Sequence, residues 1–409
     1  MPSTLISAAA SRPSDDPIFS LNAEARRRAA AGESVINATL GAMMEDDGRL
    51  AVLPSVLETF AKVPGADAAS YAPIAGDAGF LKAVIADVFA DRALAEQAVA
   101  AATPGGSGAL YQAITNFLEP GQALLTTSYY WAPYHTMATH AGRRVETFSM
   151  FLPSGGFDIA AFESALAQQI ERQGRSLIFL NTPCHNPTGY SLDDAEWQAL
   201  ARVVRAAAER APVALVVDIA YSRFGAKAAS DWTRHVPNIA GGRAAVLVAW
   251  SGSKSFAQYG ARVGALLAVH PDAAERTRIA NALSYACRGT WSNCNHLGLL
   301  AITKILSEPD LRARVDLERA RMIALLDERV TAWNREATRA GLPYPRYEGG
   351  FFVSVFSAAP EQAAARLREL GVFVVPLAEK GGGALRIALC STPSRDVPRL
   401  VAAFAKAIG

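Results

Sequence analysis

The segment 251–264 places one lysine, Lys254, among small residues directly after a strand-like apolar run. Arg262 follows eight residues later. A lysine that acts as a nucleophile near neutral pH must be partly desolvated and held near cations, and small neighbours leave room for a carbonyl partner. Most lysines are solvated surface charges. We predict Lys254 as the reactive residue because two further polar segments accompany it.

These two segments each follow or end an apolar strand candidate. Residues 181–189 read Asn-Thr-Pro-Cys-His-Asn-Pro-Thr-Gly, and residues 213–221 carry Asp218 at the end of an apolar run. Polar residues at the carboxyl ends of strands form ligand sites in open α/β sheets. An Asn-Pro-Thr-Gly stretch alone predicts only a turn. The order of all three segments predicts a catalytic site.

Length and charge restrict the function classes. A chain of 409 residues suits a large α/β core with a second lobe. The net charge is +2, so no field of one sign favours nucleic acid or a membrane surface. The four cysteines show no metal-ligand spacing. No signal peptide or apolar run of about 20 residues is found. We predict a cytoplasmic protein without a metal site.

The order of apolar and amphipathic segments predicts the fold. Strand candidates alternate with longer amphipathic segments, which predicts a mainly parallel sheet with helices on both faces. The strand candidates are residues 123–126, 144–148, 177–181, 213–218, 245–250 and 264–269. A sequence of four residues, Gly105-Gly-Ser-Gly108, precedes a helical pattern over 109–117. It predicts backbone amides at a helix start, where phosphate binds.

The remaining segments predict a second, small α+β domain. Helical patterns cover 275–306, with an interruption at 289–295, and 311–337. Strands are predicted at 351–356, 372–376 and 385–389, a turn at 381–383, and a helix from 398 to the end. We predict a large domain over 53–312 and a small domain that combines 1–52 with 313–409.

Taken together, these motifs resemble the class I, fold-type I aminotransferases that use pyridoxal 5'-phosphate, most closely the aspartate and aromatic branch. The resemblance runs from about Gly41 to Arg386. It implies a large domain with a mainly parallel sheet sandwiched by helices, and a small α+β domain. It also implies a homodimer with shared active sites that moves an amino group between an L-amino acid and a 2-oxo acid by a ping-pong mechanism.

The resemblance implies a role for each matching residue in cofactor binding. Lys254 would hold the cofactor, Asp218 its ring nitrogen, and Tyr221 and Asn186 its ring oxygen. The other cofactor-binding residues implied are Gly106, Ser107, Ser251 and Arg262 for the phosphate, Trp131 for stacking, and Tyr71 reaching the phosphate across the dimer interface. Each has a plainer structural reading, such as a turn cap for Asp218 or core filling for Trp131.

The substrate residues implied by the resemblance are Arg386, Gly41, Asn186, Trp131 and Arg288. Arg386 lies inside an apolar strand pattern, where a buried charge needs a partner such as an α-carboxylate or an acidic side chain. Around Arg288 the family pattern of two prolines is replaced by Cys294 and Asn295. The sequence therefore leaves aspartate, glutamate and aromatic amino acids open as substrates.

Other functions fit the sequence less well. Ser251 and Lys254 match the Ser-x-x-Lys pair of penicillin-binding acyl transferases, but neither Ser-Asp-Asn nor Lys-Thr-Gly occurs in the chain. A dinucleotide fingerprint would need a glycine where Tyr111 stands. A sensor protein that binds pyridoxal 5'-phosphate would need a DNA-binding region, and the segment before Gly41 is too short to form one. A lyase, cyclase or decarboxylase of the same fold remains open.

Overall fold

The computed structural model describes residues 3–12, 17–379 and 382–408. These residues form a central sheet of seven strands in the order β2-β8-β7-β6-β5-β3-β4. Strand β8 runs antiparallel to both neighbours, and the other pairs are parallel. The strands are β2 (Ala98–Pro104), β3 (Ala123–Thr127), β4 (Arg144–Phe148), β5 (Ser176–Asn181), β6 (Val213–Asp218), β7 (Ala244–Ser251) and β8 (Val263–Val269).

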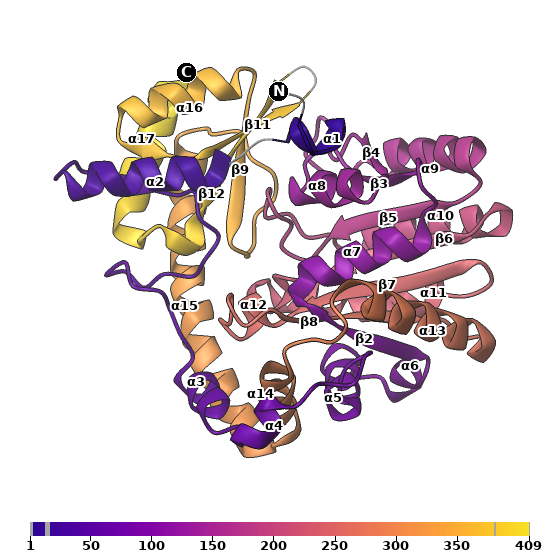
Figure 1. Cartoon of the computed structure of the whole chain (residues 1–409). Helices are drawn as coiled ribbons and strands as arrows, with labels where there is room; N and C mark the ends of the chain where they lie inside the picture. Colours follow the sequence, from indigo (N-terminus) through magenta and orange to yellow (C-terminus); the bar gives the residue numbers. More distant parts are fainter. Residues whose placement is uncertain (1–2, 13–16, 380–381, 409) are drawn as a thin grey trace.

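Helices cover both faces of this sheet because its strands are apolar on both sides. Leu124 and Phe179 pack with helices α7, α8 and α13, whereas their chain neighbours Leu125 and Ile178 pack with α9 and α10 on the opposite face. Figure 1 shows α7 and α13 lying over one face. The helices are α7 (Gly105–Phe117), α8 (Pro133–His140), α9 (Ile159–Gln173), α10 (Asp194–Arg210), α11 (Val236–Ile239), α12 (Gly252–Ser255) and α13 (Ala273–Thr290).

A second group of strands lies beyond the carboxyl ends of the parallel strands (Figure 1). Strand β1 (Ile36–Asn37) pairs with β10 (Val372–Phe373), and β11 (Val375–Glu379), β12 (Gly382–Ala388) and β9 (Phe352–Ser357) form an antiparallel sheet. Helices α2 (Pro17–Ala30), α16 (Pro360–Glu369) and α17 (Val397–Ile408) accompany these strands, and the long helix α15 (Pro309–Arg339) leads to them. Segments from the N-terminal and the C-terminal parts of the chain thus lie together in this second group of strands. The predicted domain boundaries stay predictions.

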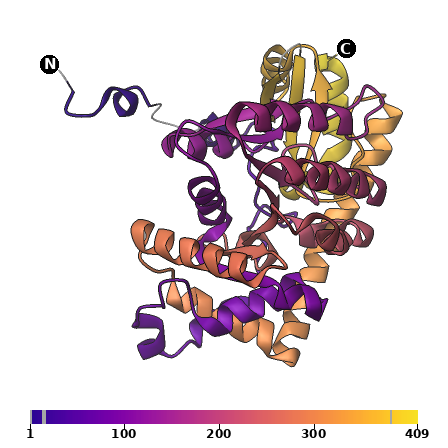
Figure 2. The ribbon, with the colours of Figure 1, turned by 90° about the vertical axis from the view of Figure 1, so that its right-hand side faces the viewer.

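The remaining α-helices belong to the early chain, except for one that directly precedes the long helix α15. They are α1 (Ser7–Ala10), α3 (Pro54–Ala61), α4 (Gly65–Ala69), α5 (Ala78–Val88), α6 (Arg92–Glu96) and α14 (His296–Ser307). Helix α1 buries none of its residues and stands away from the other helices in Figure 2. Within the described residues, no helix is long and apolar enough to cross a membrane.

The observed elements confirm the predicted fold class and correct several details. All six predicted strands of the large sheet are present, and the 275–306 helix breaks between α13 and α14 as expected. Strand β2 was not predicted, because its alanine-rich sequence has a weak strand preference. The 372–376 strand divides into β10 and β11, and α7 begins at Gly105 rather than residue 109. Of the predicted 381–383 turn, residue 381 lies outside the described residues, whereas Gly382 and Gly383 belong to strand β12.

Candidate active site

A cavity of about 200 Å³ lies at the carboxyl ends of the parallel strands. It brings together nine of the thirteen residues that the sequence predicted, namely Gly106, Ser107, Trp131, Asn186, Asp218, Tyr221, Ser251, Lys254 and Arg262, and its other lining residues are Leu110, Asn181, Ala220 and Ser253. These residues come from α7, α12, the carboxyl ends of β5, β6 and β7, the loops that follow β5 and β6, and the segments just before α8 and β8. The cavity therefore stands where an open α/β sheet binds ligands.

Asp218 ends β6 and is 6% exposed. Its Oδ2 accepts a hydrogen bond of 2.8 Å from the Tyr134 hydroxyl, and its Oδ1 accepts one of 3.2 Å from the backbone N–H of Ala220. Burial raises the pKa of Asp218, while these two donors and the charge of Lys254 act in the opposite direction. A cation in the cavity would stabilise the charged carboxylate further.

Two residues beside Asp218 were missed by the sequence analysis. Tyr134, in the first turn of α8 and three residues after Trp131, contacts the carboxylate. Asn181 pairs with Asp218 in the sheet register, and its Nδ2 donates to the Asp218 carbonyl at 2.8 Å. The position of Asn181 at a strand end was a usable signal. Nothing in the sequence pairs Tyr134 with a residue 84 positions away.

Tyr221 and Asn186 form a second polar pair in the wall of the cavity. The Nδ2 of Asn186 donates to the Tyr221 hydroxyl at 3.4 Å. Burial raises the pKa of Tyr221, so its phenol stays protonated. The Oδ1 of Asn186 is buried without a hydrogen-bond partner among the described residues. Buried polar atoms of this kind call for a ligand or water.

Lys254 lies in α12, immediately after β7. Its Nζ lies 5.7 Å from the centre of the Tyr221 ring and 5.1 Å from that of Tyr259. Desolvation by burial lowers the pKa of Lys254 to about 8, and the Arg262 charge contributes in the same direction. Because this value is close to neutral pH, an appreciable fraction of Lys254 is an uncharged amine and a nucleophile.

The start of α7 forms a cradle for an anion. Gly105 has φ +72°, and a Cβ at this position would lie 2.5 Å from Nη2 of Arg262. The guanidinium group approaches the backbone this closely because the glycine lacks a side chain. Its Nη2 also donates to the Pro104 carbonyl at 3.4 Å. Helix amides, the Ser251 hydroxyl and a guanidinium together suit a phosphate, so the residues present fit the phosphate of the predicted cofactor.

Arg386 and Gly41 do not line the cavity itself, but Arg386 lies next to it. The Arg386 charge acts to lower the pKa of Tyr221, which lines the cavity, although burial raises this pKa overall. The guanidinium is centred 4.6 Å from the Phe352 ring centre and donates to the Thr39 carbonyl at 2.7 Å. A Cβ on Gly41 would come within 2.4 Å of the same Phe352 ring. Glycine at position 41 therefore allows the backbone to pack closely against the Phe352 ring.

The two other predicted residues lie outside the cavity of this chain. The side chain of Tyr71 is 89% exposed in the segment after α4. Arg288 is exposed on α13, where its Nη1 donates to the Ser292 hydroxyl at 2.6 Å. The predicted roles of both residues require a second subunit and stay predictions.

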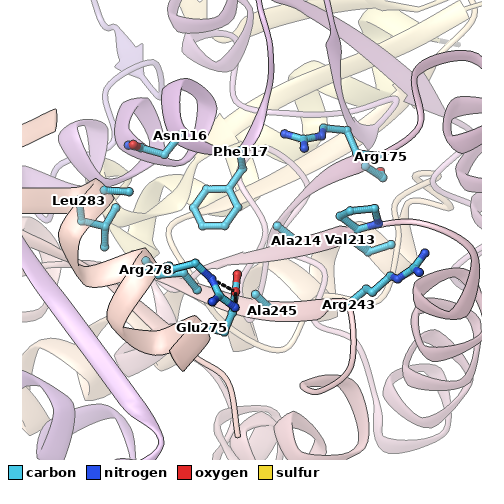
Figure 3. Close-up of a pocket in the computed structure, with 14 residues that line it drawn as sticks. Asn116, Phe117, Arg175, Val213, Ala214, Arg243, Ala245, Glu275, Arg278 and Leu283 are labelled. Carbon is cyan, nitrogen blue, oxygen red and sulfur yellow. Dashed lines mark hydrogen bonds and ion pairs between the residues drawn. The ribbon is translucent and has the colours of Figure 1, made fainter. Parts of the chain in front are cut away.

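A larger cavity of about 340 Å³ lies at the opposite, amino edge of the sheet (Figure 3). The Phe117 ring lies in its centre, and Arg175, Arg243 and Arg278 stand around it. Arg278 forms a 2.5 Å ion pair with Glu275, and Arg243 donates to the Arg210 carbonyl at 3.3 Å. Neither a lysine nor a histidine lines this cavity.

Comparison with known proteins identifies the family of the chain. Residues 33–404 match the family model described as aminotransferase class I and II. A tyrosine aminotransferase of Klebsiella pneumoniae is 29% identical over 95% of this chain and 96% of its own length. The chain belongs to the class I and II aminotransferase family.

Solved structures lead to the same family. An aminotransferase from Anaerococcus prevotii superposes with a TM-score of 0.93 at 29% identity and covers 100% of both chains. An aromatic-amino-acid aminotransferase from Burkholderia pseudomallei, covalently bound to pyridoxal phosphate, has a TM-score of 0.78 at 26% identity, covering 99% of this chain and 100% of its own. The predicted family and the fold type I architecture are confirmed. The chain is an aminotransferase, and pyridoxal phosphate is the cofactor that these findings support.

Proposed function

We propose that Lys254 and Asp218 carry out amino-group transfer between an L-amino acid and a 2-oxo acid in this cavity, with pyridoxal 5'-phosphate as the cofactor. The observation that carries the proposal is a lysine with a pKa lowered to about 8 that shares a cavity with a buried carboxylate. When bound, the cofactor supplies an electron sink that stabilises negative charge at the substrate's α-carbon. The protein residues place the reactants and move the proton.

Lys254 has two tasks in this proposal. Its uncharged amine would hold the cofactor covalently, and the freed Nζ would take the proton from the substrate's α-carbon. Asp218 keeps a cationic ring nitrogen protonated, since a buried carboxylate is stabilised by an opposite charge. The Tyr221 hydroxyl and the Asn186 amide would donate to the ring oxygen. Trp131, which precedes α8, would stack on the ring.

The start of α7 and its neighbours hold the phosphate. The donors are the backbone amides of Gly106 and Ser107, the Ser251 hydroxyl and the Arg262 guanidinium. Arg262 is suited to this task because its planar fork binds two phosphate oxygens at once. Tyr71 would add a donor from the partner subunit.

Arg386 binds the α-carboxylate of the substrate, and Gly41 lies in the segment that covers it. A buried guanidinium beside Tyr221 places a permanent positive charge next to the reacting centre. The relatives named above act on tyrosine or aromatic amino acids by their names, and we propose an aromatic amino acid as one donor. Arg288 would bind a second carboxylate of a dicarboxylic substrate across the subunit boundary.

Chemical labelling tests the proposal directly. Protein mixed with pyridoxal 5'-phosphate over a pH series and reduced with borohydride should carry the label on Lys254. The initial rate of labelling should rise as the pH passes through about 8, because the uncharged amine is the reactive form. Lys304, an exposed lysine paired with Glu308 at 3.8 Å, is the internal control and should stay unlabelled. Label on another lysine would overturn the assignment.

The proposal includes a dimer with shared active sites in the cytoplasm. Tyr71 is almost fully exposed in one chain, and a phosphate donor needs a buried position, which a partner subunit would provide. Subunits with Tyr71→Phe mixed with subunits with Lys254→Ala should therefore form heterodimers with one restored active site. Mixed samples that show only the sum of the separate activities would rule out shared sites.

A further inference from the structure

The hydroxyl of Tyr134 donates a 2.8 Å hydrogen bond to Oδ2 of Asp218. Both side chains are buried, with 1% of Tyr134 and 6% of Asp218 exposed. A hydrogen bond between a neutral donor and a buried carboxylate is among the stronger ones in proteins. Tyr134 does not line the cavity itself, and its hydroxyl acts on the cavity through Asp218.

The Tyr134 ring is held in place by its neighbours. It packs edge-on against Phe179 of β5, with ring centres 5.1 Å apart, and against Trp131 at 5.8 Å. Pro133 begins helix α8, so the backbone next to Tyr134 is also restrained. The phenol is thereby fixed on one carboxylate oxygen while the N–H of Ala220 holds the other. Each oxygen can still accept a further hydrogen bond from the cavity.

We propose that Tyr134 is a positioning residue that keeps the Asp218 carboxylate ionised and directed into the cavity, where it holds the protonated ring nitrogen of the cofactor. This inference rests on the function proposed above. A donor to the ionised form opposes the effect of burial, which favours the neutral acid. Burial also raises the pKa of Tyr134 well above its usual range, so the phenol keeps its proton and remains a donor.

The variant Tyr134→Phe tests this inference because it removes the hydroxyl and preserves the ring. The protein is loaded with pyridoxal 5'-phosphate labelled with ¹⁵N in the ring, and the nitrogen is titrated by NMR. In Tyr134→Phe the ring nitrogen should lose its proton at a pH about one to two units lower than in the wild type. The half-reaction with the amino donor should slow by about tenfold to a hundredfold.

Tyr190 provides a matched control. It is equally buried, and its hydroxyl also donates to a carboxylate, that of Glu196, outside the cavity. Tyr190→Phe should lower the melting temperature about as much as Tyr134→Phe and leave the ring-nitrogen titration unchanged. If Tyr134→Phe does not fold, Tyr134→Met removes the donor with a flexible side chain of similar length.

The outcomes separate this inference from the proposed function. A wild-type protein that does not attach the cofactor at Lys254 would refute the function. A wild type that attaches the cofactor, together with a Tyr134→Phe ring nitrogen that titrates as in the wild type, would refute the role of Tyr134 alone. An equal shift in Tyr190→Phe would show a general effect of stability and would also overturn the inference.

Discussion

The two cavities at opposite edges of the central sheet differ in chemistry more than in size. The amino-edge cavity is larger, about 340 Å³ against about 200 Å³. Its rim arginines include Arg278, paired with Glu275, and Arg243, bonded to a backbone carbonyl. The carboxyl-edge cavity instead contains the buried carboxylate of Asp218 and a lysine of lowered pKa. It also contains the amide oxygen of Asn186, which has no hydrogen-bond partner in the part of the chain that the structure describes.

The comparison shows that buried polar groups distinguish an active site better than volume does. A desolvated charge costs free energy unless a partner offsets it, so a fold retains such groups where a ligand uses them. At the carboxyl edge, parallel strands end side by side and present Asn181, Asp218 and Ser251 together. At the amino edge the same strands begin with apolar or small residues such as Val213 and Ala244.

The largest effect is expected for Lys254→Ala. Without the amine, the α-proton has no acceptor, and turnover should fall by at least about a thousandfold, while pyridoxal 5'-phosphate still binds without a covalent bond. Steady-state kinetics and equilibrium dialysis measure the two quantities. The control in the other cavity is Arg278→Ala, which should retain wild-type turnover. A comparable loss in Arg278→Ala would break the comparison between the cavities.

Asp218→Asn should have the next largest effect. A neutral amide cannot keep the ring nitrogen protonated, and removing one partner of a buried charge pair costs about 3 to 5 kcal/mol. The rate of the half-reaction should fall by about two to four orders of magnitude while the fold and cofactor binding persist. Stopped-flow single-turnover kinetics measure this rate. A near wild-type rate would mean that Asp218 serves only to cap the turn at Ala220.

A smaller effect is expected for Gly105→Ala, which tests the phosphate cradle. The new Cβ would displace Arg262 and would also strain a backbone at φ +72°. Gly121→Ala is the control, since Gly121 has φ +82° and open space around the position of a Cβ. Both should lose about 1 kcal/mol of stability, but only Gly105→Ala should bind pyridoxal 5'-phosphate more weakly. Equal affinities would argue against the cradle.

Much of the fold was predictable because its strands are short apolar runs separated by amphipathic helices. The large sheet's predicted strands and the long helix after residue 308 were found within one or two residues. Strand β2 escaped prediction because alanine prefers helices and the strand forms only by pairing with β8. Similarly, β1 consists of two residues that become a strand by pairing with β10, far along the chain.

The residues of the candidate site likewise divide into those that the sequence predicted and those that it did not. Lys254, Asp218 and Asn186 were predicted because each ends or follows an apolar strand, and Gly106 because glycines precede a helix. Tyr134 was not, because an aromatic residue in an amphipathic helix looks like core filling until its hydroxyl is placed. Tyr71 and Arg288 are exposed outside the cavity of this chain, and their predicted roles stay predictions.

By itself, the sequence determined the order of strands and helices and the polar residues at the strand ends, because hydrophobic periodicity and local backbone preferences act over a few residues. Only the tertiary structure decided which distant groups meet: the phenol of Tyr134 on Asp218, Arg262 against Gly105, and Phe352 between Gly41 and Arg386. These contacts join residues that are tens to hundreds of positions apart. They arise from close packing between elements, which local sequence does not encode.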